Sequence, residues 1–195
     1  MSTVIDAEFF YLHNSQLLLK EVSVFHIDTK QIQTFLIKSA IPFDALPLDV
    51  QGTNNYCSNS LHKISWDSGY VSKEVVDSIL KRSLSGRSVF AKGCQKARFF
   101  SKMLRIPVYN LEKLDCPKVD EIKHAPSFSC LLPQHRNGYN HCAQVKAMKF
   151  GWWLQTHEWC FKCFNGGDAF DHGGHLPDQL CPAKLKALGA WVVSK

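Results

Sequence analysis

The sequence lacks the marks of secreted, membrane-spanning and fibrous proteins. No apolar run in its 195 residues approaches the roughly 18 to 20 that cross a bilayer. Residues 1–6 have neither the basic start nor the apolar core that directs secretion. There is no internal repeat and no low-complexity tract, and a content of 45% hydrophobic residues is typical of a globular protein. We therefore expect a cytoplasmic or nuclear protein that is not secreted and has no membrane partner.

Acidic residues are missing from one stretch, residues 81–110. Eight Lys and Arg fall there without any Asp or Glu, so this stretch carries +8, whereas the whole chain carries +6. A concentrated positive field suits a polyanion, because neutralised phosphates release condensed counterions. The pattern predicts binding of single-stranded RNA or DNA; the alternative is a solvated basic helix face. A Trp can add to such a site because a base can stack on its ring. The candidate nucleic-acid-binding residues are Lys92, Lys96, Arg98, Lys102, Arg105 and Trp66.

Hydrophobic and turn patterns predict a mixed α/β fold. Three runs rich in β-branched and aromatic residues, joined by short turns, are typical of an antiparallel meander; they are residues 3–12, 16–27 and 31–38. Residues 41–69 are irregular and long for a structureless loop, so they are either functional or contain short elements. Helices and strands alternate after them; the predicted elements are a helix at 72–84, a strand at 88–91, a helix at 94–104, a strand at 107–111 and a helix at 143–154. This order favours one mixed sheet with helices packed on its faces.

Two carboxylates, Asp6 and Glu8, stand in the first predicted strand. Residues two apart in a strand point to the same face, so these side chains project together. The strand is otherwise strongly apolar, and charges in such a strand need a reason. Because Mg²⁺ and Mn²⁺ prefer hard oxygen ligands, the pair is a candidate divalent-cation site. The alternative is a pair of edge carboxylates that face water.

With this pair on the first of three antiparallel strands, the sequence resembles the DEDDh 3′–5′ exonucleases of the RNase H-like fold. The family's last motif has a His followed five residues later by an Asp; His141 matches the His, whereas Lys146 stands at the Asp position. Its middle motif places an Asp beside a short strand and helix, where residues 89–96 offer no carboxylate. The resemblance implies catalytic positions at Asp6, Glu8 and His141, with metal held by the carboxylates and water deprotonated by the His.

Cys and His also recur in the middle of the chain, and the candidate metal ligands there are Cys116, Cys130, His135 and Cys142. Structural zinc prefers thiolate and imidazole, and four such ligands complete a tetrahedron. The alternative is that the cysteines are small buried hydrophobic residues, and His141 competes with His135 as the imidazole. The pattern resembles the Maelstrom domain, which is RNase H-like, lacks the full exonuclease carboxylate set and binds zinc through a Glu-Cys-His-Cys group. The resemblance implies a zinc site in which Cys116 replaces the Glu, and it implies RNA binding.

The composition changes near residue 156. We expect an RNase H-like domain over residues 1–155 and a Cys/His-rich extension over residues 156–195. A CxxC pair with two later ligands is typical of a zinc knuckle, and the alternative is a Gly-rich tail with incidental His. The candidate ligands are Cys160, Cys163, His175 (or His172) and Cys181. This extension is also the expected contact for a protein partner.

The function that these features predict is binding of single-stranded nucleic acid, with RNA favoured, by a relative of the 3′–5′ exonucleases whose metal site is degenerate. Nuclease activity is expected to be weak or absent. The alternatives are an active metal-dependent exonuclease or ribonuclease and a zinc-stabilised adaptor for protein partners. The sequence leaves open whether the protein is an enzyme; if it is one, we expect a phosphodiesterase.

Overall fold

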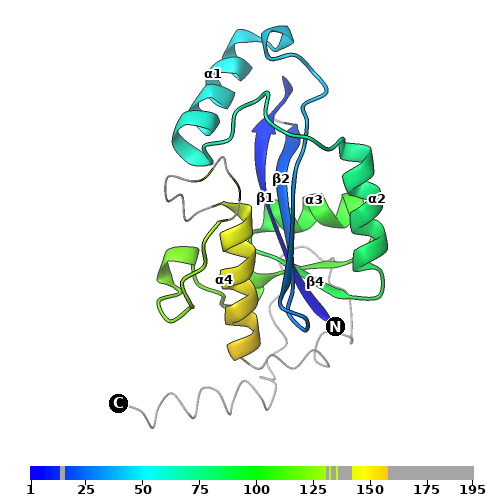
Figure 1. Ribbon diagram of the computed structural model, residues 1–195, viewed down its shortest axis with the longest axis vertical. Helices are drawn as coiled ribbons and strands as arrows, with labels where there is room; N and C mark the ends of the chain where they lie inside the picture. The colour runs from blue at the N-terminus through cyan, green and yellow to red at the C-terminus, as the bar shows by residue number, and fades with distance from the viewer. Residues whose placement is uncertain (14–15, 131, 133–134, 136–141, 158–195) are drawn as a thin grey trace.

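The computed structural model describes residues 1–13, 16–130, 132, 135 and 142–157. Five strands form one sheet in the order β3-β2-β1-β4-β5 (Figure 1). Their bounds are Ser2–Tyr11 for β1, Leu17–His26 for β2, Gln31–Leu36 for β3, Ser88–Ala91 for β4 and Val108–Asn110 for β5. The first three strands pair antiparallel, β4 runs parallel to β1, and β5 runs parallel to β4. The predicted mixed α/β architecture is therefore confirmed, and the strands lie close to their predicted bounds.

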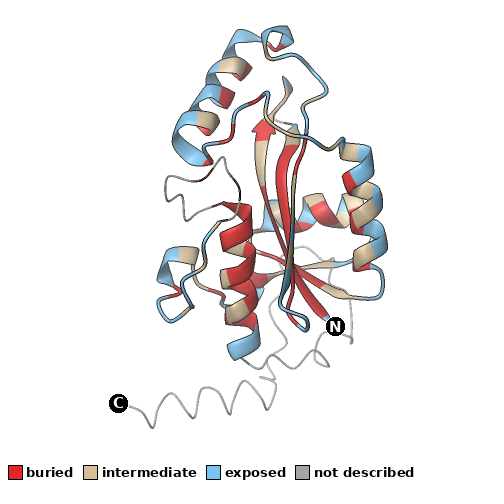
Figure 2. Ribbon diagram, in the orientation of Figure 1, coloured by how far each residue is buried: buried red, intermediate tan, exposed pale blue. Residues whose placement is uncertain are grey.

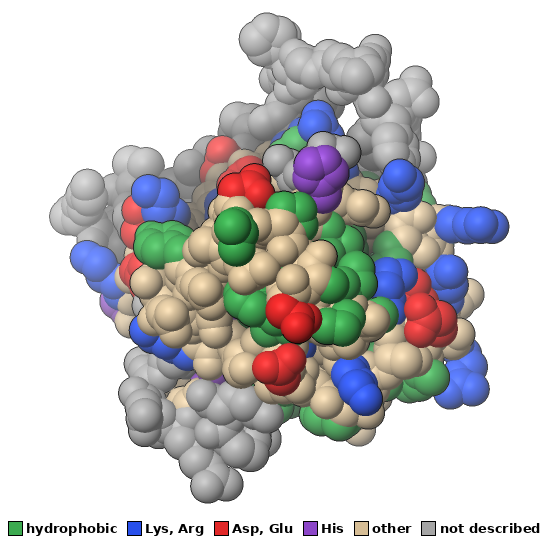
Figure 3. Space-filling model, turned by 90° about the horizontal axis from the view of Figure 1, so that it is seen from above, with side chains coloured by type: hydrophobic (Ala, Val, Ile, Leu, Met, Phe, Trp, Pro, Cys, Tyr) green, Lys and Arg blue, Asp and Glu red, His purple; other side chains and the backbone are tan. Residues whose placement is uncertain are grey.

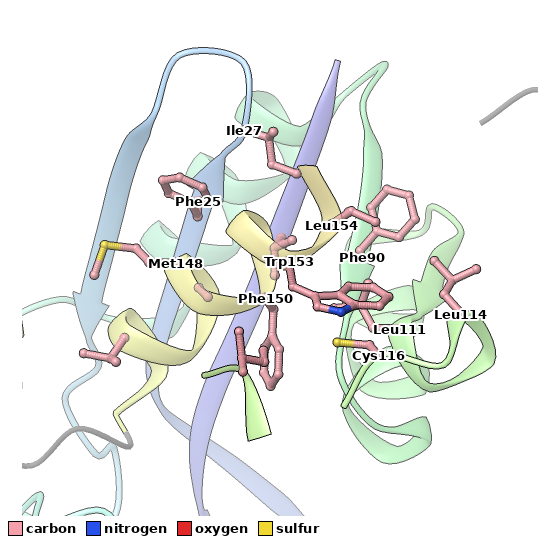
Figure 4. Packing of buried hydrophobic residues seen from close by; sticks show 14 of the residues in the cluster. Phe25, Ile27, Phe90, Leu111, Leu114, Cys116, Met148, Phe150, Trp153 and Leu154 are labelled. Atoms are coloured by element: carbon pink, nitrogen blue, oxygen red, sulfur yellow. The ribbon is translucent and has the colours of Figure 1, made fainter. Parts of the chain in front are cut away.

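Helices cover both faces of this sheet. α2 (Lys73–Leu84) and α3 (Cys94–Leu104) pack on one face, and α4 (Ala143–Thr156) packs on the other. The three helices begin where the sequence predicts, and Ser72 caps α2 by accepting a hydrogen bond from the Val75 N–H. α4 is buried along most of its length (Figure 2). Figure 4 shows Trp153 and Leu154 of α4 in the apolar cluster between this helix and the sheet.

Successive side chains of β1 point to opposite faces of the sheet. Val4 belongs to the apolar cluster under α4, whereas Ile5 and Ala7 belong to the cluster under α2 and α3. Asp6 and Glu8 therefore share the α4 face with Val4, as the strand period predicts. The neighbouring strand β2 is interrupted by a bulge opposite Glu8 and Phe9.

Residues 41–69 contain short elements, which is one of the two interpretations that the length of this irregular stretch allows. They contain α1 (Leu48–Tyr56), one π-helical turn at Cys57–Leu61 (η3) and a short 3-10 turn at Phe43–Ala45. Trp66 lies in the small apolar core that holds this segment against β1. Its side chain is buried and its indole N–H donates to the carbonyl of Ile41 at 2.9 Å. The prediction of Trp66 as a base-stacking residue is therefore corrected, because its ring is enclosed by the fold.

Several predictions fall outside the described residues. These are the C-terminal zinc knuckle, with Cys160, Cys163, His172, His175 and Cys181, and the candidate general base His141. Among the described helices, none is both long and apolar enough to cross a membrane.

Candidate functional site

The carboxylates of β1 face two ammonium groups. Lys96, in the first turn of α3, donates a hydrogen bond to Asp6 with its Nζ 2.6 Å from Oδ1. Lys146, in the first turn of α4, places its Nζ 3.5 Å from the other Asp6 oxygen and forms a closer ion pair with Glu8. Asp6 is only 1% exposed, so this ion cluster is an internal feature of the domain. The structure thus brings together the two predicted carboxylates, Lys146, which stands where the exonuclease resemblance expects Asp, and Lys96, from the stretch where the resemblance expects an Asp and the sequence has no carboxylate.

The ion cluster balances two negative charges with two positive ones. Burial raises the pKa of Glu8, whereas the nearby Lys146 and Lys96 lower it. An ammonium group has three donors and no lone pair, so neither lysine can coordinate a divalent cation while it is charged. Within the described residues, Asp6 and Glu8 therefore have cationic partners supplied by the chain itself.

A second group of polar side chains lies beside this cluster, at the start of α4. The ligand atoms of Cys130, His135 and Cys142 lie within 4.8 Å of one another, so these three residues can hold a metal ion. Cys142 is the N-cap of α4, and its sulfur accepts from the Val145 N–H at 3.5 Å. The Cys130 sulfur lies 3.3 Å from Nδ1 of His135. Three of the four predicted mid-chain ligands thus come together.

A hydrogen bond to the backbone orients the imidazole of His135 so that it can ligate a metal. Its Nε2 lies 3.1 Å from the backbone carbonyl of His62, directly after the π-helical turn. A carbonyl only accepts, so Nε2 carries the proton and Nδ1 presents its lone pair toward Cys130. Metal-ligating histidines characteristically donate their other ring N–H in this way. Burial raises the pKa of the Cys142 thiol, and a metal ion would have to offset that cost by binding the thiolate.

Cys116 does not belong to this group. It packs in the apolar cluster under α4, and its sulfur lies 3.6 Å from the carbonyl oxygen of Pro117. Burial raises its pKa to about 12, and its sulfur is not among the ligand atoms that lie within 4.8 Å of one another. The alternative interpretation given above, a buried hydrophobic cysteine, describes Cys116.

Glu21 of β2 is the residue that the sequence interpretation missed. It is fully buried, its carboxylate lies 3.8 Å from Nε2 of His135, and neither oxygen accepts a hydrogen bond of normal geometry within the described residues. Burial raises its pKa to about 8, and the neighbouring charge of Glu8, its cross-strand partner, adds to the shift. Its carboxylate faces Nε2, the ring atom that donates to the His62 carbonyl, and its oxygens are not among the ligand atoms that lie within 4.8 Å of one another, so Glu21 borders the metal-capable group without belonging to it. The signal was present in the sequence: like Asp6, Glu21 is a charge inside an apolar strand.

The eight basic residues of 81–110 divide into two groups. Three have partners within the domain: Arg87 lies 3.6 Å from Asp28, Lys92 donates to the Cys116 carbonyl at 2.5 Å, and Lys96 contacts Asp6. The exposed residues are Lys81, Arg82, Arg98, Lys102 and Arg105. They lie on or at the ends of α2 and α3, which cover the sheet face opposite α4. Of the predicted nucleic-acid contacts, Lys92 and Lys96 are thus engaged internally.

The three exposed basic residues of the α3 region form one stripe. Arg98 and Lys102 are four residues apart on α3 and therefore lie on one side of the helix, and Arg105 follows as its C-cap residue. We call these three residues the basic stripe. It belongs to α3, which packs on the sheet face opposite α4, whereas Asp6 and Glu8 share the α4 face of β1 with Val4.

A scan of the chain against models of protein families found no match, and a search of curated proteins found none either.

Proposed function

We propose that this chain is an RNase H-like domain that binds single-stranded nucleic acid, with RNA favoured, and does not use its β1 carboxylates for metal-dependent hydrolysis. The observation that carries the proposal is the contact of Lys96 and Lys146 with Asp6 and Glu8. The antiparallel meander followed by parallel strands supports the fold assignment, because the exonuclease resemblance implies the same order of elements.

The ion cluster argues against two-metal chemistry on electrostatic grounds. Two-metal hydrolysis needs cations that bridge the attacking and leaving oxygens, held by several carboxylates. Here the charge that a cation would neutralise is already neutralised by ammonium groups from two different helices. A divalent ion would have to displace both lysines and leave them near its own charge. The carboxylates and lysines therefore act as a structural ion cluster that joins β1 to α3 and α4.

Nucleic-acid binding is supported by the basic stripe. Its three side chains are exposed, and each can contact a phosphate without breaking an internal ion pair among those described. For single strands, each phosphate contact adds about −0.7 to the slope of log K against log salt concentration. The three residues of the basic stripe therefore predict a contribution of about −2 to the slope of log K against log salt concentration.

The metal-capable group supports a structural zinc ion. Its donors are two thiols and one imidazole, which structural zinc prefers. The Maelstrom resemblance implies a carboxylate as well, and the buried Glu21 would have to turn its carboxylate away from Nε2 of His135 to become that fourth ligand. The three donors come from the segment before α4 and from the N-cap of α4. A zinc ion there would fix the first turn of α4, and with it the position of Lys146.

The binding test compares two triple charge reversals in the full chain. The first variant removes the basic stripe by Arg98→Glu, Lys102→Glu and Arg105→Glu. The control variant makes a charge change of the same size at exposed lysines elsewhere, by Lys38→Glu, Lys113→Glu and Lys123→Glu. Fluorescence anisotropy with a labelled single-stranded RNA of mixed sequence should show salt-dependent binding by the wild type. The stripe variant should lower the salt slope by about 2, and the control should retain more of the wild-type slope. Equal loss in the two variants, or no binding by the wild type at low salt, would overturn the proposed binding site.

The hydrolysis test uses the same RNA labelled at its 5′ end, with and without Mn²⁺. We expect no Mn²⁺-dependent shortening by the wild type. Asp6→Asn keeps the shape of the side chain and removes its charge, so it separates catalysis from folding. Mn²⁺-dependent cleavage by the wild type that disappears in Asp6→Asn would show that the carboxylates are catalytic and would refute this part of the proposal.

A further inference from the structure

One end of the molecule carries most of the large hydrophobic side chains that the described chain exposes. Of the seven large hydrophobic residues that are exposed in the described chain, four lie in the segment around α1: Ile41, Leu48, Tyr56 and Leu61. Leu48 is 84% exposed and Tyr56 is 60% exposed. The inner side of α1 is already used, since Val50 belongs to the small core against β1 and Asn54 is buried. The exposed hydrophobic side chains of α1 are therefore not the ones that pack this helix against β1.

Leu48, Gly52 and Tyr56 form one stripe along α1, because residues four apart lie on the same side of a helix. We call this the α1 stripe. A side-chain carbon at Gly52 would meet nothing within 4 Å, so internal packing does not require glycine at this position. Glycine inside a helix nevertheless costs stability. Its presence leaves a notch between two large apolar side chains, which lie roughly 12 Å apart along the helix axis.

Residues 39–62 carry charge of one sign, and Lys63, the next residue, donates from its Nζ to the Asn59 carbonyl. Residues 39–62 contain Asp44 and Asp49 and no Lys or Arg, in a chain of net charge +6. Figure 3 looks onto this end of the molecule and shows hydrophobic side chains among uncharged ones, with Lys and Arg mostly toward the edges of the view. An acidic face repels nucleic acid and anionic lipid surfaces, so neither fits this surface.

We propose that the α1 stripe is a docking site for an amphipathic helix of another protein, whose apolar side chains are flanked by Lys or Arg. One apolar side chain of the partner would fill the notch at Gly52, between Leu48 and Tyr56, in the manner of a knob in a hole. The flanking cations would face Asp44 and Asp49. A second copy of this chain is disfavoured, because an α1-to-α1 contact would place acidic residues opposite acidic residues. This surface is separate from the basic stripe, so the inference does not rest on nucleic-acid binding.

The test titrates the full chain into two fluorescein-labelled model peptides of equal length. One is an amphipathic helix of Leu and Lys, and the other has the same pattern with Glu in place of Lys. We expect the Leu/Lys peptide to bind and the Leu/Glu peptide not to bind. Gly52→Gln fills the notch with a good helix former and should weaken binding of the Leu/Lys peptide about tenfold, as should Leu48→Ala combined with Tyr56→Ala. Asp44→Asn with Asp49→Asn should weaken binding and reduce its salt dependence.

The control variant is Tyr70→Ala with Val75→Ala, which removes two exposed hydrophobic residues outside the α1 segment. This control variant should bind the Leu/Lys peptide like the wild type. Thermal unfolding followed by circular dichroism should show that Gly52→Gln has a melting temperature no lower than that of the wild type. The proposal is overturned if the control weakens binding as much as the α1 variants, or if neither peptide binds. Sedimentation gives one more outcome: a dimer of the wild type that Gly52→Gln dissociates would assign the surface to a second copy of this chain instead.

Discussion

At the scale of single residues, Lys146 pairs with more of the buried negative charge of β1 than Lys96 does. Its ammonium group contacts both carboxylates of β1, whereas Lys96 contacts Asp6 alone. The Lys146 side chain is 17% exposed and Glu8 is 14% exposed, so the pair is only weakly screened by water. Removal of one partner from such a pair leaves a buried charge without compensation.

Lys146→Met keeps most of the side-chain volume and removes the charge. We expect a loss of about 3 kcal/mol in the free energy of unfolding at pH 7, measured by urea denaturation. The loss should shrink toward pH 5, because the Glu8 pKa is already raised and the carboxyl can then protonate. Lys149→Met on the same helix is the matched control and should cost much less. Equal losses in the two variants would mean that the effect comes from helix packing and not from the ion cluster.

Glu21 gives the metal-free protein a distinctive dependence on pH. Its pKa rises from the ordinary 4.5 to about 8 in the folded state. Between these values the folded protein holds a proton that the unfolded chain has lost, so this contribution to stability falls as the pH rises. The lowered pKa of His62, about 4, acts in the opposite direction only up to the ordinary 6.5. The fall due to Glu21 should therefore be visible between pH 6.5 and pH 8.

We expect the free energy of unfolding of EDTA-treated protein to decrease across that window by up to about 1.4 kcal/mol per pH unit. Glu21→Gln should flatten the decrease, because the amide does not titrate. If Glu21 turns to ligate zinc, the zinc-bound wild type should not show the decrease, since a ligating carboxylate is already ionised. A decrease of the same size in Glu21→Gln would assign it to another group.

Several site residues could be predicted from sequence alone, and the exceptions have physical reasons. The two-residue period of a strand placed Asp6 and Glu8 together, and ligand chemistry identified Cys130, His135 and Cys142. Cys116 was included because a thiol in sequence does not show whether it faces a site or an apolar core. Glu21 was overlooked because its neighbours in the site are brought close only by the register of β2 and by the packing of α4.

At the scale of secondary-structure elements, the strongly patterned segments were predictable and α1 was not. The buried stripe of α2, with Val76, Leu80 and Leu84, has the helical period. α1 combines Gly, Thr and Asn, which are weak helix formers. It is held by contacts from elsewhere: the Asn54 side chain accepts from the Tyr11 N–H at 2.8 Å and donates to the Tyr11 carbonyl at 2.9 Å. Because α1 depends on contacts with distant residues, its own sequence has no helical pattern from which the helix could be predicted.

Two glycines inside helices should respond in opposite ways to the same change. Gly52→Ala in α1 adds a methyl group to open space and should raise the free energy of unfolding by about 0.5 to 1 kcal/mol. Gly151→Ala in α4 would place its new carbon 2.3 Å from the Phe25 ring, which is buried against the helix. That variant should lose about 1 to 3 kcal/mol through overpacking. Thermal and urea unfolding of the two variants measure the difference, and a shift of the same sign in both would contradict the close packing of α4 on β2.

At the scale of the whole molecule, the proposed zinc ion would tie the start of α4 to Cys130 and His135, and through His135 to the carbonyl of His62, which is distant in sequence. We expect purified protein to contain zinc and chelation to lower the melting temperature by about 10 °C, equivalent to a few kcal/mol for a chain of this size. Cys130→Ser and Cys142→Ser should each lose the metal and melt like chelated wild type. Cys116→Ser is the control, because it lies outside the metal-capable group, and it should retain zinc. Retention of zinc by Cys142→Ser would place the metal elsewhere.

The position of β1 also affects how the chain is made. β1 gains β2 as a neighbour early, but Lys96 lies 90 residues after Asp6, and Lys146 comes later still. Contacts at such separations form only after a large loop has closed. At a synthesis rate of about 5 to 20 residues per second, the ribosome adds Lys146 on the order of ten seconds after Asp6 and Glu8. During that interval the nascent meander must keep Asp6, Glu8 and Glu21 hydrated, so its first three strands cannot complete their packing before the ribosome has delivered α4.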